Sequence, residues 1–159
     1  MIIMLNVGDK APDFSLASDD GTTVTLKSLY GRKVVLYFYP KDDTPGCTKE
    51  ACSFTDSLGK LEDEGATVIG VSADTTDDHQ KFKHKYNLEF PLLSDPSTEM
   101  LQKYGVWKEK NMYGKKFMGI ERTTYIINRD GYVAAIFPRV QVDGHTEEVL
   151  AKLQDLKKK

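Results

Sequence analysis

Residues 34–52 read VVLYFYPKDDTPGCTKEAC and indicate a buried strand, a turn and the start of a helix. The apolar, β-branched and aromatic run at residues 34–39 is typical of a strand that is covered on both faces. The segment Thr44-Pro45-Gly46 has the order of a helix N-cap followed by proline at the first helical position. We therefore expect Cys47 in the first turn of a helix, where unpaired backbone N–H groups and the helix dipole favour an anion. Since the thiolate is the nucleophilic form of cysteine, this position suits a reactive residue.

Cys47 and Cys52 are the only cysteines in the chain. The first residues lack the basic start and the length of a signal peptide, so we expect a cytoplasmic protein. Two cysteines in such a chain argue against a disulfide scaffold and favour a reactive or redox pair.

The composition is that of an ordinary soluble domain, with 40% apolar and 29% charged residues among 159. We expect one domain that spans residues 1–159. A net charge of −2 gives no reason to expect a nucleic-acid or membrane partner. The basic run Lys157–Lys159 is interpreted as a frayed helix end.

Strand and helix patterns alternate along the chain. Strands are expected at residues 11–16, 23–26, 34–39, 67–72, 90–95, 123–128 and 132–137, and helices at residues 44–64, 76–86, 97–104 and from 143 to the end. The first two strands are expected to form an N-terminal β-hairpin, and Arg129-Asp130-Gly131 is a hairpin signal between the last two. The pattern predicts an α/β protein with a central mixed β-sheet flanked by helices. Cys47 follows the carboxyl end of its strand, where the ligand sites of such sheets gather.

The motif Pro40-x-x-x-Thr44-x-x-Cys47 resembles the active-site signature of the peroxiredoxins. The longer run from Phe38 to Cys52 is similar to the bacterioferritin-comigratory-protein (PrxQ) subfamily. The similarity covers most of the chain. It includes residues 8–14, 70–72, 92–95, 104–107 and 119–123.

This resemblance implies a thioredoxin-like fold and a thiol peroxidase that needs no cofactor and no metal. It implies that Cys47 is the peroxidatic cysteine and Cys52 the resolving one, with Thr44, Arg122 and Pro40 completing the pocket. Cys47 would become a sulfenic acid, Cys52 would condense with it to a disulfide, and thioredoxin or a similar dithiol would reduce that disulfide. We expect a monomer or a weak dimer.

Each of these residues also has a plainer interpretation. Cys47 and Cys52 could be buried structural residues without a chemical role, since free cysteines are commonly buried. Arg122 could be an exposed residue at the edge of a strand. Thr44 is expected to cap the helix by accepting from the N–H of Cys47 and, in another state, to contact the peroxide. Pro40 ends the strand because it lacks a donor, and the resemblance adds that its ring shields the thiolate.

Other polar residues are assigned to the surface. We interpret Asp42, Asp43 and Glu50 as carboxylates of a solvated loop and a first helical turn. The three histidines do not form a ligand set, since His79 and His84 are five residues apart on a helix, and all three, His145 included, are expected on the surface.

Residues 107–118 are expected to form a loop. It carries the apolar residues Trp107, Tyr113, Phe117 and Met118 and several lysines. Either the apolar residues cover the core, or some of them form a rim for alkyl peroxides or a surface for a partner. The sequence leaves both interpretations open.

Two rival functions are compatible with a redox pair. A thioredoxin-like disulfide reductase or isomerase would use Cys-x-x-Cys, whereas this chain has Cys-x-x-x-x-Cys. A non-enzymatic peroxide sensor that passes its oxidation to a partner would need the same two cysteines. Steady turnover of peroxide with a dithiol separates an enzyme from a sensor.

Overall fold

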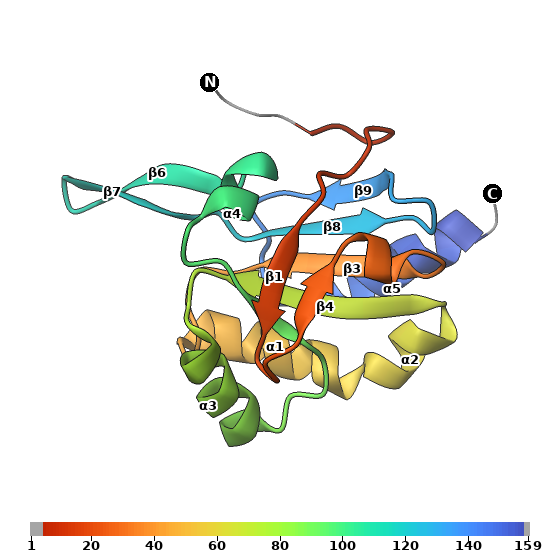
Figure 1. Ribbon diagram of the computed structural model, residues 1–159, viewed down its shortest axis with the longest axis horizontal. Coiled ribbons are helices and arrows are strands. Elements are labelled where there is room, and N and C mark those ends of the chain that lie inside the picture. Colours follow the sequence, from red (N-terminus) through yellow and green to blue (C-terminus); the bar gives the residue numbers. More distant parts are fainter. Residues whose placement is uncertain (1–4, 158–159) are drawn as a thin grey trace.

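The computed structural model describes residues 5–157, which form a seven-stranded sheet, a separate two-stranded hairpin and the helices around them (Figure 1). The strands of the large sheet are β1 (Ser15–Ser18), β2 (Thr23–Thr25), β3 (Lys33–Phe38), β4 (Ala66–Ser72), β5 (Leu92–Ser94), β8 (Thr123–Ile127) and β9 (Val133–Phe137). The helices are α1 (Pro45–Asp56), α2 (Leu58–Asp63), α3 (Thr76–Tyr86), α4 (Glu99–Lys103) and α5 (His145–Lys157), and a short 3₁₀ helix covers Lys27–Leu29. The strand order is β2-β1-β5-β4-β3-β8-β9.

The sheet is mixed, and β3 lies inside it. Leu36 of β3 pairs with Ile69 of the parallel strand β4 and with Tyr125 of the antiparallel strand β8. The N-terminal hairpin of β1 and β2 adds antiparallel strands at one edge. The predicted central mixed sheet and N-terminal hairpin are therefore confirmed.

Both faces of the sheet are covered, which explains why β3 is apolar without interruption. Val35 and Tyr37 face a core that includes residues of α1, α2, α3 and α5. Val34 and Leu36 face a second core that includes residues of α4. In Figure 1, α1, α2 and α3 lie below β4, whereas α4 lies beside the ends of β6 and β8. Because successive side chains of a strand point to opposite faces, each face of β3 needs its own apolar set.

The helix expected over residues 44–64 is two helices. Ser57, with φ −103° and ψ 9°, leaves the helical conformation and separates α1 from α2. Apolar residues recur at helical spacing both before and after Ser57, so the sequence pattern does not indicate the break between the two helices. The first strand, expected at residues 11–16, begins only at Ser15, and the remaining elements differ from expectation by one or two residues at their ends.

Residues 107–118 were wrongly expected to form a loop. They belong to an antiparallel hairpin of β6 (Trp107–Met112) and β7 (Lys115–Ile120), which projects from the body in Figure 1. Tyr113 and Gly114 make the turn with positive φ values of 54° and 81°, as hairpin turns require. Both faces of the strands are largely exposed, so the sequence shows no alternation of apolar and polar residues.

The apolar residues of this hairpin do not all cover the core. Trp107 is half-buried and packs on the second core. Tyr113 is 99% exposed, and Phe117 and Met118 are also exposed, so the core-covering interpretation is wrong for these three. Among residues 5–157, no helix is long and apolar enough to span a bilayer.

Candidate active site

The loop after β3 places Cys47 at the start of α1. Thr44 is the N-cap residue in an extended conformation, and Pro45 opens the helix, as predicted. Cys47 occupies the third helical position, and only 1% of it is exposed. Its thiol therefore lies at the positive end of the α1 dipole, shielded from bulk water.

Arg122 contacts this thiol. It lies between β7 and β8, and its Nη2 donates a hydrogen bond to the Sγ of Cys47 at 3.4 Å. Its Nη1 donates to Oε1 of Glu50 at 2.7 Å. Burial lowers the pKa of Arg122, but the neighbouring Glu50 and Cys47 outweigh it and raise the pKa overall. One planar guanidinium thus joins the thiol to a carboxyl group, and the interpretation of Arg122 as an exposed strand-edge residue is wrong.

Glu50 is buried, which corrects its expected place on the surface. Only 1% of the residue is exposed, one turn after Cys47 on the same helix. Burial raises the pKa of Glu50 to about 7, although Arg122 lowers it. Its Oε2 has no hydrogen-bond partner within the part of the chain that is described. Near neutral pH, Glu50 is therefore poised between its acid and its carboxylate.

Thr44 does not cap the helix with its side chain. Its hydroxyl donates to the carbonyl oxygen of Lys41 at 2.9 Å, so the predicted bond to the N–H of Cys47 is absent. The oxygen of that hydroxyl keeps its lone pairs free to accept a hydrogen bond. Pro40, which has no N–H to donate, is half-buried directly after the last buried tyrosine of the strand region.

Cys52 lies on the same continuous helix as Cys47. It is half-buried and packs against the first core, and both cysteines are free thiols. Burial, aided by the charge of Asp56, raises the pKa of Cys52. On an unbroken helix five residues correspond to about 7.5 Å along the axis and about 140° around it. The two thiols therefore face different directions.

Comparison with known proteins decides the family. The AhpC/TSA family model matches residues 7–136. The putative peroxiredoxin bcp of Coxiella burnetii is 52% identical over 149 residues, which are 94% of this chain and 99% of that protein. The peroxiredoxin Bcp of Bacillus subtilis is 45% identical and covers 98% of this chain and 99% of its own. The chain is a peroxiredoxin of the Bcp (PrxQ) group.

Solved structures agree with this assignment. A PrxQ from Xylella fastidiosa superposes with a TM-score of 0.92 at 37% identity, over 98% of this chain and 99% of its own. The bacterioferritin comigratory protein of Xanthomonas campestris superposes with a TM-score of 0.89 at 39% identity, over 94% and 98% of the two chains. The peroxiredoxin described here is thus an enzyme with a thioredoxin fold, and its activity is that of a thiol peroxidase.

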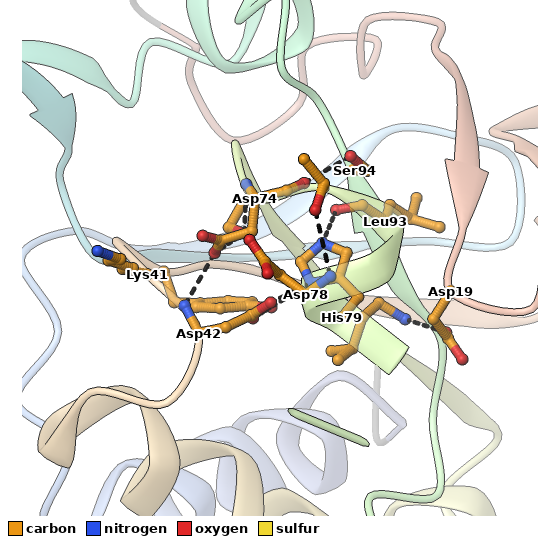
Figure 2. A network of polar contacts seen from close by, with 12 residues as sticks. Asp19, Lys41, Asp42, Asp74, Asp78, His79, Leu93 and Ser94 are labelled. Atoms are coloured by element: carbon orange, nitrogen blue, oxygen red, sulfur yellow. Dashed lines mark hydrogen bonds and ion pairs between the residues drawn. The ribbon is translucent and has the colours of Figure 1, made fainter. Parts of the chain in front are cut away.

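This peroxiredoxin also contains a buried polar cluster beside the cysteine loop that the sequence did not reveal (Figure 2). Asp42 and His79 are buried, with 9% and 0% exposed, and their side chains lie 2.6 Å apart. Their expected surface positions are therefore wrong. Asp43 and His84 are exposed, as expected.

His145 is the second buried histidine. Its Nε2 lies 2.8 Å from the hydroxyl of Thr124 and its Nδ1 lies 2.9 Å from the carboxylate of Glu148. Its ring packs edge-on against Phe54 of α1 and Phe137 of β9. Burial lowers the pKa of His145, although Glu148 opposes this. His145 therefore belongs to the packing between α5 and α1.

Proposed function

We propose that the thiolate of Cys47 reduces hydroperoxides and that Cys52 completes the reaction within the same chain. The observation that carries this proposal is the 3.4 Å hydrogen bond from Arg122 to the buried Cys47 at the start of α1. A fixed cation and a helix N-terminus both favour the anionic sulfur that a peroxidase needs.

The first step is an in-line displacement at the terminal peroxide oxygen. An electron pair of the sulfur forms the S–O bond, the O–O bond breaks, and its electron pair leaves on the second oxygen. That oxygen takes up a proton and departs as water or an alcohol, while Cys47 is left as a sulfenic acid. The Arg122 guanidinium and the first N–H groups of α1 stabilise the negative charge that moves along this line.

Thr44 and Pro40 fit the roles expected of a peroxide pocket. Because the Thr44 hydroxyl already donates to the carbonyl of Lys41, its oxygen can accept a hydrogen bond from the O–H of a hydroperoxide. That bond would orient the substrate along the line of attack. Pro40 offers no competing donor and restricts the access of water.

The second step requires α1 to unwind. On the intact helix the Cα atoms of Cys47 and Cys52 would be roughly 8–9 Å apart, beyond the ~7 Å that a disulfide can bridge. We therefore propose that the segment from Thr44 to Phe54 unfolds locally once Cys47 is oxidised. The thiol of Cys52 then attacks the sulfenic sulfur, the S–O bond breaks, and water leaves as the disulfide forms.

A dithiol such as thioredoxin then restores both thiols. We propose that the chain acts as one domain, as a monomer or weak dimer in the cytoplasm, without a nucleic-acid or membrane partner. The Xanthomonas campestris relative reduces alkyl peroxides. We propose that organic hydroperoxides, as well as hydrogen peroxide, are substrates here.

The experiment is steady-state peroxide consumption with thioredoxin, thioredoxin reductase and NADPH. We expect continued turnover by the native chain and none by Cys47→Ser. Cys52→Ser is the matched control, since it keeps the nucleophile and should form a trappable sulfenic acid once. Oxidation of the native chain without sustained turnover would instead support a sensor. Full activity of Cys47→Ser would refute the assignment of the nucleophile.

A further inference from the structure

Asp42 lies five residues before Cys47 and anchors the loop between β3 and α1. Its Oδ1 accepts a hydrogen bond from the Tyr39 hydroxyl at 2.6 Å, and its Oδ2 lies 2.6 Å from Nδ1 of His79. Its backbone N–H donates to Asp74 at 2.8 Å. Figure 2 shows these contacts converging from separate elements on one loop residue. Asp42 is thus tied to the residue that follows β3, to α3 and to the segment after β4.

His79 makes this anchor dependent on a proton. Its Nε2 faces the carbonyl oxygen of Leu93 at 2.9 Å, and because a carbonyl only accepts, Nε2 carries hydrogen. Its Nδ1 faces a carboxylate oxygen of Asp42 and can donate only if the ring is a doubly protonated imidazolium. Burial lowers the pKa of His79, but Asp42, the Leu93 carbonyl and Asp74 together raise it. The structure therefore favours an imidazolium paired with a carboxylate.

The next loop residue carries backbone strain that α3 holds in place. Asp43 has a φ of 58°, in the left-handed region that costs a non-glycine residue energy. Its carboxylate accepts hydrogen bonds from Lys85 and from the Tyr86 hydroxyl, both at 2.8 Å. Helix α3 therefore holds two consecutive residues of the loop, a buried one through His79 and an exposed one through its last turn.

We infer that the ion pair of His79 with Asp42 holds the loop before α1 and thereby sets how readily Cys47 leaves its peroxide-reactive position. This inference rests on the proposed function and names positioning residues for it. The loop positions the carbonyl of Lys41, which accepts from Thr44, and Thr44 begins the helix that carries Cys47. While the pair is intact, Asp42 stays fixed, and unwinding that starts in α1 cannot spread past this residue. When the pair breaks, the strained Asp43 relaxes and the unwound state gains population.

The pair also gives this equilibrium a pH dependence of defined sign. The groups facing His79 are Asp42 from the loop, Tyr39 directly after β3, Asp74 after β4 and the Leu93 carbonyl from β5. Because the pKa of His79 is raised above its ordinary 6.5, the anchor is fully formed below that pH. The anchor is lost as the pH rises through the raised pKa of His79. Nδ1 then has no proton to donate, and its lone pair faces the lone pairs of the Asp42 carboxylate. Alkaline pH therefore favours the unwound state.

The test measures the two chemical steps separately in His79→Phe. The peroxide step is followed as sulfenic acid formation in a Cys52→Ser background, and the disulfide step is followed with both cysteines present. Loss of a buried charged hydrogen bond predicts about a tenfold shift in the ratio of the two rates, with a slower peroxide step and a faster disulfide step. An unchanged ratio would overturn the inference, because a merely structural histidine would change stability alone.

Further variants keep the test decisive. Lys83→Met is the matched control, because it removes an ion pair to Asp19 from the same helix without touching Asp42, and it should leave the ratio unchanged. If His79→Phe does not fold, Tyr39→Phe removes one hydrogen bond to Asp42 and should shift the ratio in the same direction. His79→Asn can still donate to Asp42 and should restore much of the native ratio.

The pH dependence gives an independent readout. Hydrogen-exchange protection factors of residues 42–54 are measured in Cys47→Ser combined with Glu50→Gln, so that the titration of Glu50 does not contribute, and they should fall as the pH rises above 6.5. The fall should be absent when His79→Asn is added to this background, and its persistence there would overturn the inference. Failure of Cys52→Ser to form any sulfenic acid while His79 is intact would instead refute the proposed function.

Discussion

Replacing Glu50 by glutamine should flatten the pH dependence of stability. Burial raises the pKa of Glu50 to about 7 in the folded protein, compared with its ordinary 4.5. Since the folded value is the higher one, the stabilising contribution is complete below 4.5 and is lost as the pH rises through about 7. A separation of about 2.5 in pKa corresponds to about 3 kcal/mol, because one pKa unit is worth about 1.4 kcal/mol. Glu50→Gln removes this loss and keeps an oxygen that can accept from Arg122.

The assay is urea unfolding between about pH 4.5 and pH 8, with and without Glu50→Gln in a Cys47→Ser background. The background removes the reactive thiol, and the comparison cancels the contributions of His79 and of the other groups that both proteins share. The unfolding free energy of Glu50→Gln, relative to its parent, should rise by about 3 kcal/mol across this range. Glu109→Gln on β6 is the matched control, since that carboxylate is exposed and should change nothing comparable. If the unfolding free energies of the parent and of Glu50→Gln change in parallel with pH, burial does not outweigh Arg122 in setting the pKa of Glu50, and the reasoning is refuted.

Arg122→Lys keeps the charge but loses the planar fork that reaches both Glu50 and Cys47, so sulfenic acid formation measured by stopped flow should slow about 10–100-fold. A rate equal to the native one would show that charge alone suffices. Arg122→Ala should slow sulfenic acid formation more than Arg122→Lys does, because it loses the charge as well as the hydrogen bond to the thiol. A rate equal to that of Arg122→Lys would show that the charge of residue 122 contributes nothing. Gly46→Ala places a Cβ 3.1 Å from Nη2 of Arg122 and stiffens the helix start by up to about 1 kcal/mol, so both the peroxide step and the disulfide step should slow. A disulfide step as fast as in the native chain would show that unwinding does not limit it.

Local chemistry made the start of the site predictable from sequence. The unbroken apolar run of β3 required two covered faces, and Thr44-Pro45-Gly46 specified a helix start, so the position of Cys47 followed. The residues that contact Cys47 and its helix come from distant parts of the sequence. Local sequence patterns therefore predicted exposed positions for some residues that are buried. Glu50 fits the general preference for carboxylates near a helix N-terminus, but the cation that pairs with it, Arg122, is 72 residues away.

The residues that anchor the loop before α1 are also distant from each other in sequence. Asp42 and His79 are 37 residues apart, and each lies in a polar stretch that is typical of a solvated surface. Their burial arises because α3 packs beside the end of β3, an arrangement that only the folded sheet creates. The hairpin of β6 and β7 was missed for a different reason, since exposure on both faces leaves no apolar periodicity to detect.

The central claim is that peroxide oxidises Cys47 and that Cys52 of the same chain then captures it. Mass spectrometry of the reduced protein, quenched after one equivalent of peroxide and digested without reductant, tests both parts together. We expect a peptide pair joined by a Cys47–Cys52 disulfide in a protein of single-chain mass, and in Cys52→Ser a sulfenic acid on Cys47 alone. A disulfide that links two chains, or first oxidation at Cys52, would contradict this mechanism.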